Sequence, residues 1–97
     1  MALECSRLVF SRHALHRMNA RAISEIDVRV VVAGGEVIAD YADDKPYPSV
    51  LLLGFVGDRK LHVVIARESS TGQCVVVTAY EAKPEKWETG FRLRRLK

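Results

Sequence analysis

Two β-strand-like segments joined by a two-residue turn constrain the fold of this chain more than any other feature. Residues 51–56 and 59–66 are dominated by leucine, valine, isoleucine and phenylalanine, and only Gly57 and Asp58 lie between them. A glycine-containing turn of two residues between two such segments is typical of an antiparallel hairpin. The centre of the chain is therefore predicted to be a β-hairpin, and the other elements have to pack around it.

The register of this hairpin decides which side chains share a face of the sheet. If the two turn residues form the whole loop, Leu53 lies opposite His62, and opposite residues project from the same face. One face is then almost entirely apolar, with Val50, Leu52, Val56, Leu61, Val63 and Ile65. The other face includes polar side chains, so we expect the two helices to cover the first face and leave the second open except for a short C-terminal helix.

A third β-rich segment, Cys74–Tyr80, follows a loop that ends at Gly72. A three-residue loop with Gly72 in the left-handed conformation places Val75, Val77 and Ala79 on the apolar face. A four-residue loop would instead turn Thr78 and Tyr80 towards the helices, because a shift of one residue moves every side chain to the other face. The hydrophobic pattern favours the shorter loop. We therefore expect one face to carry Lys60, His62, Thr78 and Tyr80.

Two helices are predicted ahead of the hairpin. Ser11 is a suitable N-cap for a helix that extends to Arg21. Ser24 and Asp27 resemble a capping box at the start of a second helix, which glycines end at residues 34 and 35. The β-branched run at residues 30–32 of this second segment is equally compatible with a strand.

The order of the predicted elements indicates an α+β fold. Short strands at residues 7–10 and 37–41 flank the two helices, and Pro84 begins a short C-terminal helix that carries Trp87 and Phe91. Helices grouped before the strands predict two N-terminal helices on one face of a four- to five-stranded antiparallel sheet. With 97 residues, we expect residues 1–97 to form a single domain.

Charge and cysteine content narrow the class of protein. No apolar run is long enough to span a membrane. Cys5 and Cys74 have no motif spacing, which predicts reduced thiols and a cytoplasmic location. The net charge of +3 is compatible with binding to nucleic acid without demonstrating it.

Several short motifs carry a resemblance to one family. They are Phe10–Ala14 with Arg17, Met18 and Arg21, then Gly35–Ile38, Pro46–Pro48, Leu61–Val64, Thr78–Glu81 and Pro84–Trp87. Together they resemble a small bacterial family known as domain of unknown function 4258. The predicted topology is also similar to the RelE and BrnT class of toxins. The resemblance implies a type II toxin that acts as a metal-independent, mRNA-interferase-like endoribonuclease with no cofactor.

The resemblance also implies the partners of the protein. They are RNA, including ribosome-bound mRNA, and a small antitoxin of the zinc-finger or helix-turn-helix type. Because one fold hosts many functions, a non-catalytic protein- or RNA-binding module of the same fold is the alternative.

The residues on the polar face suit metal-free RNA cleavage. Such a reaction needs a general base, a general acid and cations around the phosphate, and histidine titrates near neutrality. His62, with Tyr80 opposite and Lys60 two residues before it, is the predicted catalytic cluster. The structural alternative is that His62 packs on Phe55 and forms a hydrogen bond with Tyr80.

A second candidate site lies on the first helix and a third on the C-terminal tail. His13, Arg17 and Arg21 follow at i, i+4 and i+8 and line one helix face, where they could bind phosphates or an acidic partner. Alternatively, the two arginines pair with Asp40 or Glu36. The tail offers the same phosphate or partner contacts, or only a solvated end, through Arg92, Arg94 and Arg95.

The two candidate sites are expected to lie far apart, since the helices should cover the face opposite the catalytic cluster. A metal site is not expected either, because His13 and His16 lack a neighbouring cysteine or carboxylate.

Overall fold

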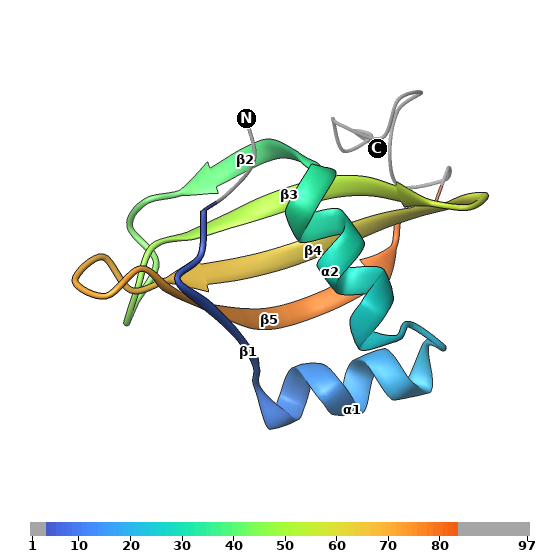
Figure 1. The fold of residues 1–97 in the computed structure, drawn as a ribbon, viewed down its shortest axis with the longest axis horizontal. Helices are drawn as coiled ribbons and strands as arrows, with labels where there is room; N and C mark the ends of the chain where they lie inside the picture. The colour runs from blue at the N-terminus through green and yellow to red at the C-terminus, as the bar shows by residue number, and fades with distance from the viewer. Residues whose placement is uncertain (1–3, 84–97) are drawn as a thin grey trace, which may run out of the picture.

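A computed structural model of the chain describes residues 4–83, which form a five-stranded sheet with two helices packed against one face (Figure 1). The elements in chain order are β1 Arg7–Phe10, α1 Arg12–Ala20, α2 Glu25–Gly34, β2 Glu36–Tyr41, β3 Ser49–Val56, β4 Arg59–Arg67 and β5 Gln73–Glu81. The strand order is β1-β5-β4-β3-β2. The predicted combination of α and β elements is confirmed, and no helix within the described residues is long and apolar enough to cross a membrane.

The prediction of an entirely antiparallel sheet is wrong. The sheet is mixed, because β1 pairs in parallel with β5 whereas the other neighbours are antiparallel. A strand of four residues carries no signal of its direction, and this one pairs with a strand that begins 63 residues after its own end. Residues 84–97, where the C-terminal helix with Trp87 and Phe91 was predicted, lie outside the described residues, and the described chain ends shortly after β5.

Both helices begin at the predicted N-caps. The Ser11 hydroxyl accepts a hydrogen bond from the Ala14 N–H at 3.0 Å. Ser24 and Asp27 form the complete capping box, with both reciprocal hydrogen bonds at 3.0 Å. These caps satisfy N–H groups that have no partner inside a helix. Residues 30–32 are helical, so the strand alternative is excluded.

The turn between the helices is held by a left-handed residue and an arginine. Ala22 has φ of +56°, and the Ile23 N–H donates to the Met18 carbonyl at 2.9 Å, as in a Schellman motif. Arg59 at the start of β4 donates to the Ala22 carbonyl at 2.8 Å and to the Arg21 carbonyl at 3.2 Å. The hairpin is thereby fastened to the end of α1.

The predicted register of the central hairpin is confirmed. Val56 lies opposite Arg59 and Leu53 opposite His62, as a two-residue turn requires. Gly57 in this turn has φ of +60°. The helix-side core includes Leu52, Leu61, Val63 and Ile65, together with Met18, Val28 and Val31 from the helices.

Strand β5 combines the two registers considered from the sequence. Tyr80 lies opposite His62 as predicted, but a bulge shifts the pairing by one residue in the half nearer the loop, where Arg67 lies opposite Cys74. The extra residue is Val77, so the burial predicted for Val75 and Val77 is wrong. Cys74 and Val76 are buried beneath the helices instead, while Val77 is 40% exposed. A bulge allows both halves of a strand to present apolar residues to one core.

The two cysteines are joined, which corrects the prediction of reduced thiols. Cys5 and Cys74 form a disulfide, with their Cα atoms 5.5 Å apart. The parallel pairing of β1 with β5 brings Cys5 close to Cys74, because Leu8, only three residues after Cys5, lies opposite Cys74. Sequence spacing alone does not reveal such a non-local pairing.

Candidate functional site

The predicted catalytic cluster of Lys60, His62 and Tyr80, called the sheet cluster below, is brought together by the pairing of β4 with β5. His62 and Tyr80 lie opposite each other on β4 and β5, and their ring centroids are 5.3 Å apart in an edge-to-face contact at 84°. Lys60 is half-buried two residues before His62 and projects from the same face. The three side chains therefore share the face turned away from the helices.

This face is less open than the sequence suggested. His62 is fully buried, with an exposed fraction of 0%, and its neighbours Leu51 and Leu53 are 3% and 2% exposed. Leu51 packs with Ile38, Ala39, Val64 and Ala82 in a second apolar cluster. A buried imidazole cannot contact RNA in this conformation, so catalysis by His62 would require its cover to move.

The predicted helix trio, His13, Arg17 and Arg21, does not form one set of equivalent side chains. The Arg17 Nε donates a hydrogen bond to the His13 Nε2 at 2.6 Å. Arg21 donates to the Ala79 carbonyl at 2.8 Å and lies 3.4 Å from the Thr78 hydroxyl. Arg21 thus fastens α1 to β5. The ion pairs found within residues 4–83 do not include the alternative pairing of either arginine with Asp40 or Glu36.

Arg21 also connects the two candidate regions that the sequence placed far apart. Its contacts at Thr78 and Ala79 adjoin Tyr80 in the chain, at the edge of β5 that extends beyond β1. The helix trio therefore approaches the predicted sheet cluster at the rim of the sheet, without forming a common site with the buried His62.

The exposed side of α1 is strongly basic. Residues 5–24 contain four arginines and two histidines but no aspartate or glutamate. The basic residues whose side chains face solvent from α1 form a surface that we call the α1 basic face, namely Arg12, His13, His16 and Arg17. Within residues 4–83, none of these four side chains forms an ion pair with a carboxylate. Uncompensated arginines and histidines on one helix face are suited to binding phosphate groups.

Acidic residues concentrate elsewhere on the molecule. Asp40, Asp43 and Asp44 lie on β2 and in the loop after it. Near the helices, Asp27 and Glu81 lie 3.9 and 3.5 Å from the guanidinium of Arg59. This arginine was not among the residues selected from the sequence, and its contacts are structural. The separation of charge leaves the α1 basic face without neutralising neighbours on its own helix.

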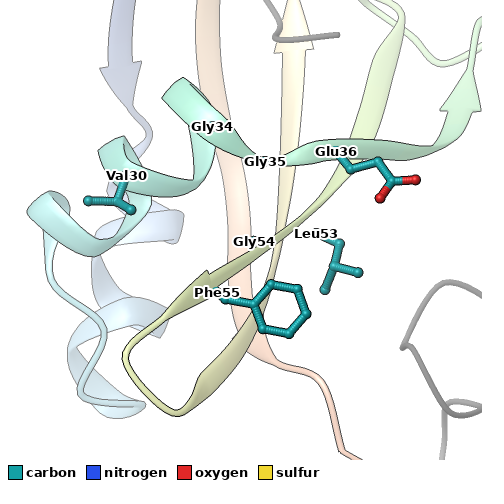
Figure 2. A pocket seen from close by; sticks show the side chains of 7 residues that line it. All are labelled: Val30, Gly34, Gly35, Glu36, Leu53, Gly54 and Phe55. Carbon is teal, nitrogen blue, oxygen red and sulfur yellow. The ribbon is translucent and has the colours of Figure 1, made fainter.

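A cleft that the sequence did not reveal lies where α2 ends and β2 begins (Figure 2). Its volume is about 330 Å³, and it is lined by Val30, Gly34, Gly35, Glu36, Leu53, Gly54 and Phe55. Gly54 permits α2 to approach the sheet, because a Cβ at this position would lie only 2.7 Å from a methyl group of Val31. The sequence signals were the glycines at 34, 35 and 54, but their spatial convergence could not be read from their spacing.

The remaining candidates are a metal site and the basic tail. Between residues 4 and 83, no three histidine, cysteine, aspartate or glutamate side chains are grouped as metal ligands. The basic tail with Arg92, Arg94 and Arg95 lies outside the described residues.

Comparison with known proteins shows the family of the chain. No curated protein and no solved structure is significantly similar to it. The similarity to RelE and BrnT toxins therefore stays a prediction. The family profile described as Domain of unknown function (DUF4258) matches residues 10–81, from the end of β1 to the end of β5, and the chain belongs to this family.

Proposed function

We propose that this protein binds RNA and that the α1 basic face contacts the RNA phosphates. The observation that carries the proposal is the absence of any carboxylate from residues 5–24, a segment that presents Arg12, His13, His16 and Arg17 to solvent. Arginine donates paired hydrogen bonds to phosphate oxygens, and a cation that binds a phosphate releases a counterion from the RNA. The face therefore supplies both attraction and geometry for a phosphate backbone.

The hydrogen bonds of the helix divide its arginines into two roles. Arg17 uses its Nε to donate to His13, and this contact orients the guanidinium while its two terminal amino groups can still donate to phosphate. Arg21 donates to the backbone of β5 and so acts as a positioning residue. Arg12 and Arg17 are consequently the expected phosphate ligands.

The test is fluorescence anisotropy with a fluorescein-labelled single-stranded RNA of about twelve nucleotides, measured across a series of salt concentrations. Replacing Arg17 with glutamine should weaken binding several-fold and lower the slope of log K against log salt by about 0.7, the value for one phosphate on a single strand. Lys45→Gln removes the same charge from the exposed loop after β2 and is the matched control. Equal effects of the two variants would show that only net charge matters, and the α1 basic face would not be the site.

A metal-independent endoribonuclease toxin, neutralised by a small zinc-finger or helix-turn-helix antitoxin, is the second candidate function. The ring contact between His62 and Tyr80 favours it, since two proton-transferring groups meet beside Lys60. Cleavage of the labelled RNA, alone or on ribosomes, should fall about 10²–10⁴-fold in His62→Gln if the imidazole transfers a proton. Full burial of the ring weighs against this mechanism. Full activity of the His62→Gln variant would show that His62 is not a catalytic residue.

The cellular setting determines how both assays are performed. We also propose that the protein is cytoplasmic, as the sequence predicts. The Cys5–Cys74 disulfide is of a kind that persists mainly in oxidising compartments. RNA binding and cleavage should therefore be measured with the disulfide intact and after reduction.

A further inference from the structure

We propose that His13 and Arg17 form a proton-coupled phosphate site, in which His13 takes up a proton when an RNA phosphate binds. The site rests on the proposed function, because both residues belong to the α1 basic face, and it makes RNA binding dependent on pH. His13 and Arg17 lie four residues apart on α1, and both are exposed. Side chains at this spacing are neighbours on a helix surface, so one phosphate group can contact both.

A hydrogen bond joins the two side chains. The Arg17 Nε–H donates to the His13 Nε2 at 2.6 Å. An imidazole nitrogen accepts a hydrogen bond only when it carries no proton, so His13 is neutral here and its proton is on Nδ1. The guanidinium of an arginine keeps its charge and its protons throughout the physiological range of pH. The hydrogen bond therefore exists only in the neutral form of His13.

Protonation of His13 replaces this hydrogen bond with two free donors. The Nε2 atom then carries a proton and cannot accept from Arg17, and two like charges at i and i+4 repel each other. The Arg17 guanidinium has to turn away, which frees its Nε–H. A phosphate placed between the side chains can accept from the His13 Nε2–H and from the Arg17 Nε–H, and its negative charge offsets the repulsion. One proton from solvent thus converts a contact within the protein into two donors for a phosphate.

The helix and the strand beneath it offer protonated His13 no counter-charge. The other titratable side chains of α1 and its C-cap are all basic, and the first turn contains no acidic residue. α1 packs against β5, where the titratable residues are Tyr80 and Glu81 (Figure 1). Both follow Ala79, which Arg21 contacts from the C-terminal end of α1, whereas His13 lies in the first turn.

The elements before and after α1 in the chain are similar in this respect. Arg7 is the only charged residue of β1, and the guanidinium of Arg29 on α2 lies 5.4 Å from the centre of the Phe10 ring. The carboxylates of α2, Glu25 and Asp27, are in its own first turn, which follows the end of α1. Within residues 4–83, no ion pair includes His13. A bound phosphate would supply the missing negative charge.

The direction of the pH dependence follows from this exchange of contacts. Phosphate binds the protonated form of His13 more tightly, so binding takes up protons and the affinity rises as the pH falls. Histidine changes its charge between about pH 5 and pH 8, whereas a phosphodiester keeps its single negative charge over that range. By linkage, each proton that is taken up contributes a slope of up to about −1 to a plot of log K against pH.

Fluorescence anisotropy with a rhodamine-labelled oligouridylate, at constant ionic strength, tests this coupling, since uracil does not titrate in the range of histidine. The parent protein should bind about ten-fold more tightly near pH 5.5 than near pH 7.5, the gain from one charge-assisted hydrogen bond. His13→Gln retains an acceptor for Arg17 but cannot be protonated, so it should lose most of this increase. His16→Gln is the matched control, because His16 is an exposed histidine of the same helix without a bond to Arg17, and it should retain most of the increase.

Nuclear magnetic resonance of the ¹⁵N-labelled protein separates the site from its function in RNA binding. Near pH 7.5, the Arg17 Nε–H should exchange with solvent more slowly in the parent than in His13→Ala, which removes the acceptor. Sulfate, whose charge is constant in this range, is the probe for the anion site and should bind more tightly near pH 5.5 than near pH 7.5.

The outcomes distinguish the proton coupling from the proposed function. RNA binding with the same pH dependence in His13→Gln as in the parent, or an equal loss in His16→Gln, would overturn the coupling and leave RNA binding intact. Arg17 Nε–H exchange that does not respond to His13→Ala would overturn it as well. Sulfate binding that depends on pH and on His13, without any binding of RNA, would support the site and overturn the proposed function.

Discussion

The contact between Gly54 on β3 and Val31 on α2 yields the sharpest prediction for stability. A Cβ at Gly54 would lie 2.7 and 2.8 Å from the two Val31 methyl groups and 3.0 Å from the Val31 Cβ. Val31 is 1% exposed, and its Cβ is fixed to the helix backbone, so a rotamer change alone cannot relieve the overlap. Overpacking of this kind costs about 1–3 kcal/mol, and we expect Gly54→Ala to lie near the upper end.

The expected loss is measurable by thermal and urea unfolding followed by circular dichroism. A loss of about 2–3 kcal/mol corresponds to a decrease in Tm of roughly 10–20 °C in a domain of this size. Val31→Ala alone should also destabilise, by about 2 kcal/mol, because it removes two buried methyl groups. Since the same deletion makes room for a Cβ at Gly54, the double variant should be more stable than the sum of the single effects by about 1–2 kcal/mol.

Gly34→Ala is the matched control, because a Cβ at Gly34 meets no atom within 4 Å. This substitution should be neutral or stabilising by up to about 1 kcal/mol, since alanine favours a helix more than glycine does. Additive effects of Gly54→Ala and Val31→Ala, or a neutral Gly54→Ala, would refute the argument that absence of a side chain at Gly54 sets the distance between α2 and the sheet.

Three further perturbations test local features of the fold by the same unfolding measurements. Ala22→Gly should stabilise by about 0.5–1 kcal/mol, because Ala22 has φ of +56° and glycine adopts this conformation without strain; a destabilised variant would contradict the Schellman assignment. Ser24→Ala should cost about 1 kcal/mol by removing the cap that Ser24 shares with Asp27, whereas an unchanged midpoint would show that the cap contributes nothing. Cys5→Ser should cost up to about 4 kcal/mol, the chain-entropy value for a crosslink that spans 69 residues, and it should match the effect of reduction in the parent protein.

Local features of the sequence predicted the central part of the fold correctly. The two-residue turn at Gly57 and Asp58 determined the register of β3 and β4, and the serine caps located both helices. Features that depend on distant residues were not accessible. Neither the direction of β1 nor the crosslink from Cys5 can be inferred before its pairing with β5 is known.

The bulge in β5 shows why patterning alone gave only half of the register. In Cys74–Tyr80, the residues buried beneath the helices are Ala79 near one end and Cys74 and Val76 near the other. No single alternating register places all three on the same face. A choice between two uniform registers had to misplace one half, because the strand uses an extra residue to satisfy both. The predicted pairing of Tyr80 with His62 is therefore correct, whereas the burial of Val75 and Val77 is not.

The candidate sites were likewise predictable only where they depend on local sequence. The succession of basic residues along α1 was visible in the sequence, because a helical period places them on one side. The burial of His62 was not visible, since it depends on what covers the sheet face around Leu51 and Leu53. The cleft was also inaccessible, because it exists only where β2 stops short of the end of β3.

The two edge strands of the sheet are shorter than their neighbours, and the strand edges that they leave free differ in their contacts. Beyond the end of β1, the exposed edge of β5 is occupied by Arg21, which donates to the Ala79 carbonyl at 2.8 Å. Beyond the end of β2, the described residues place no comparable side chain across the edge of β3 at Phe55. Uncovered strand edges promote pairing with other chains, so folded proteins usually block them. Within residues 4–83, the fold therefore satisfies the short free edge of β5 with a side chain of its own, whereas the short edge of β3 beside the cleft receives no such contact.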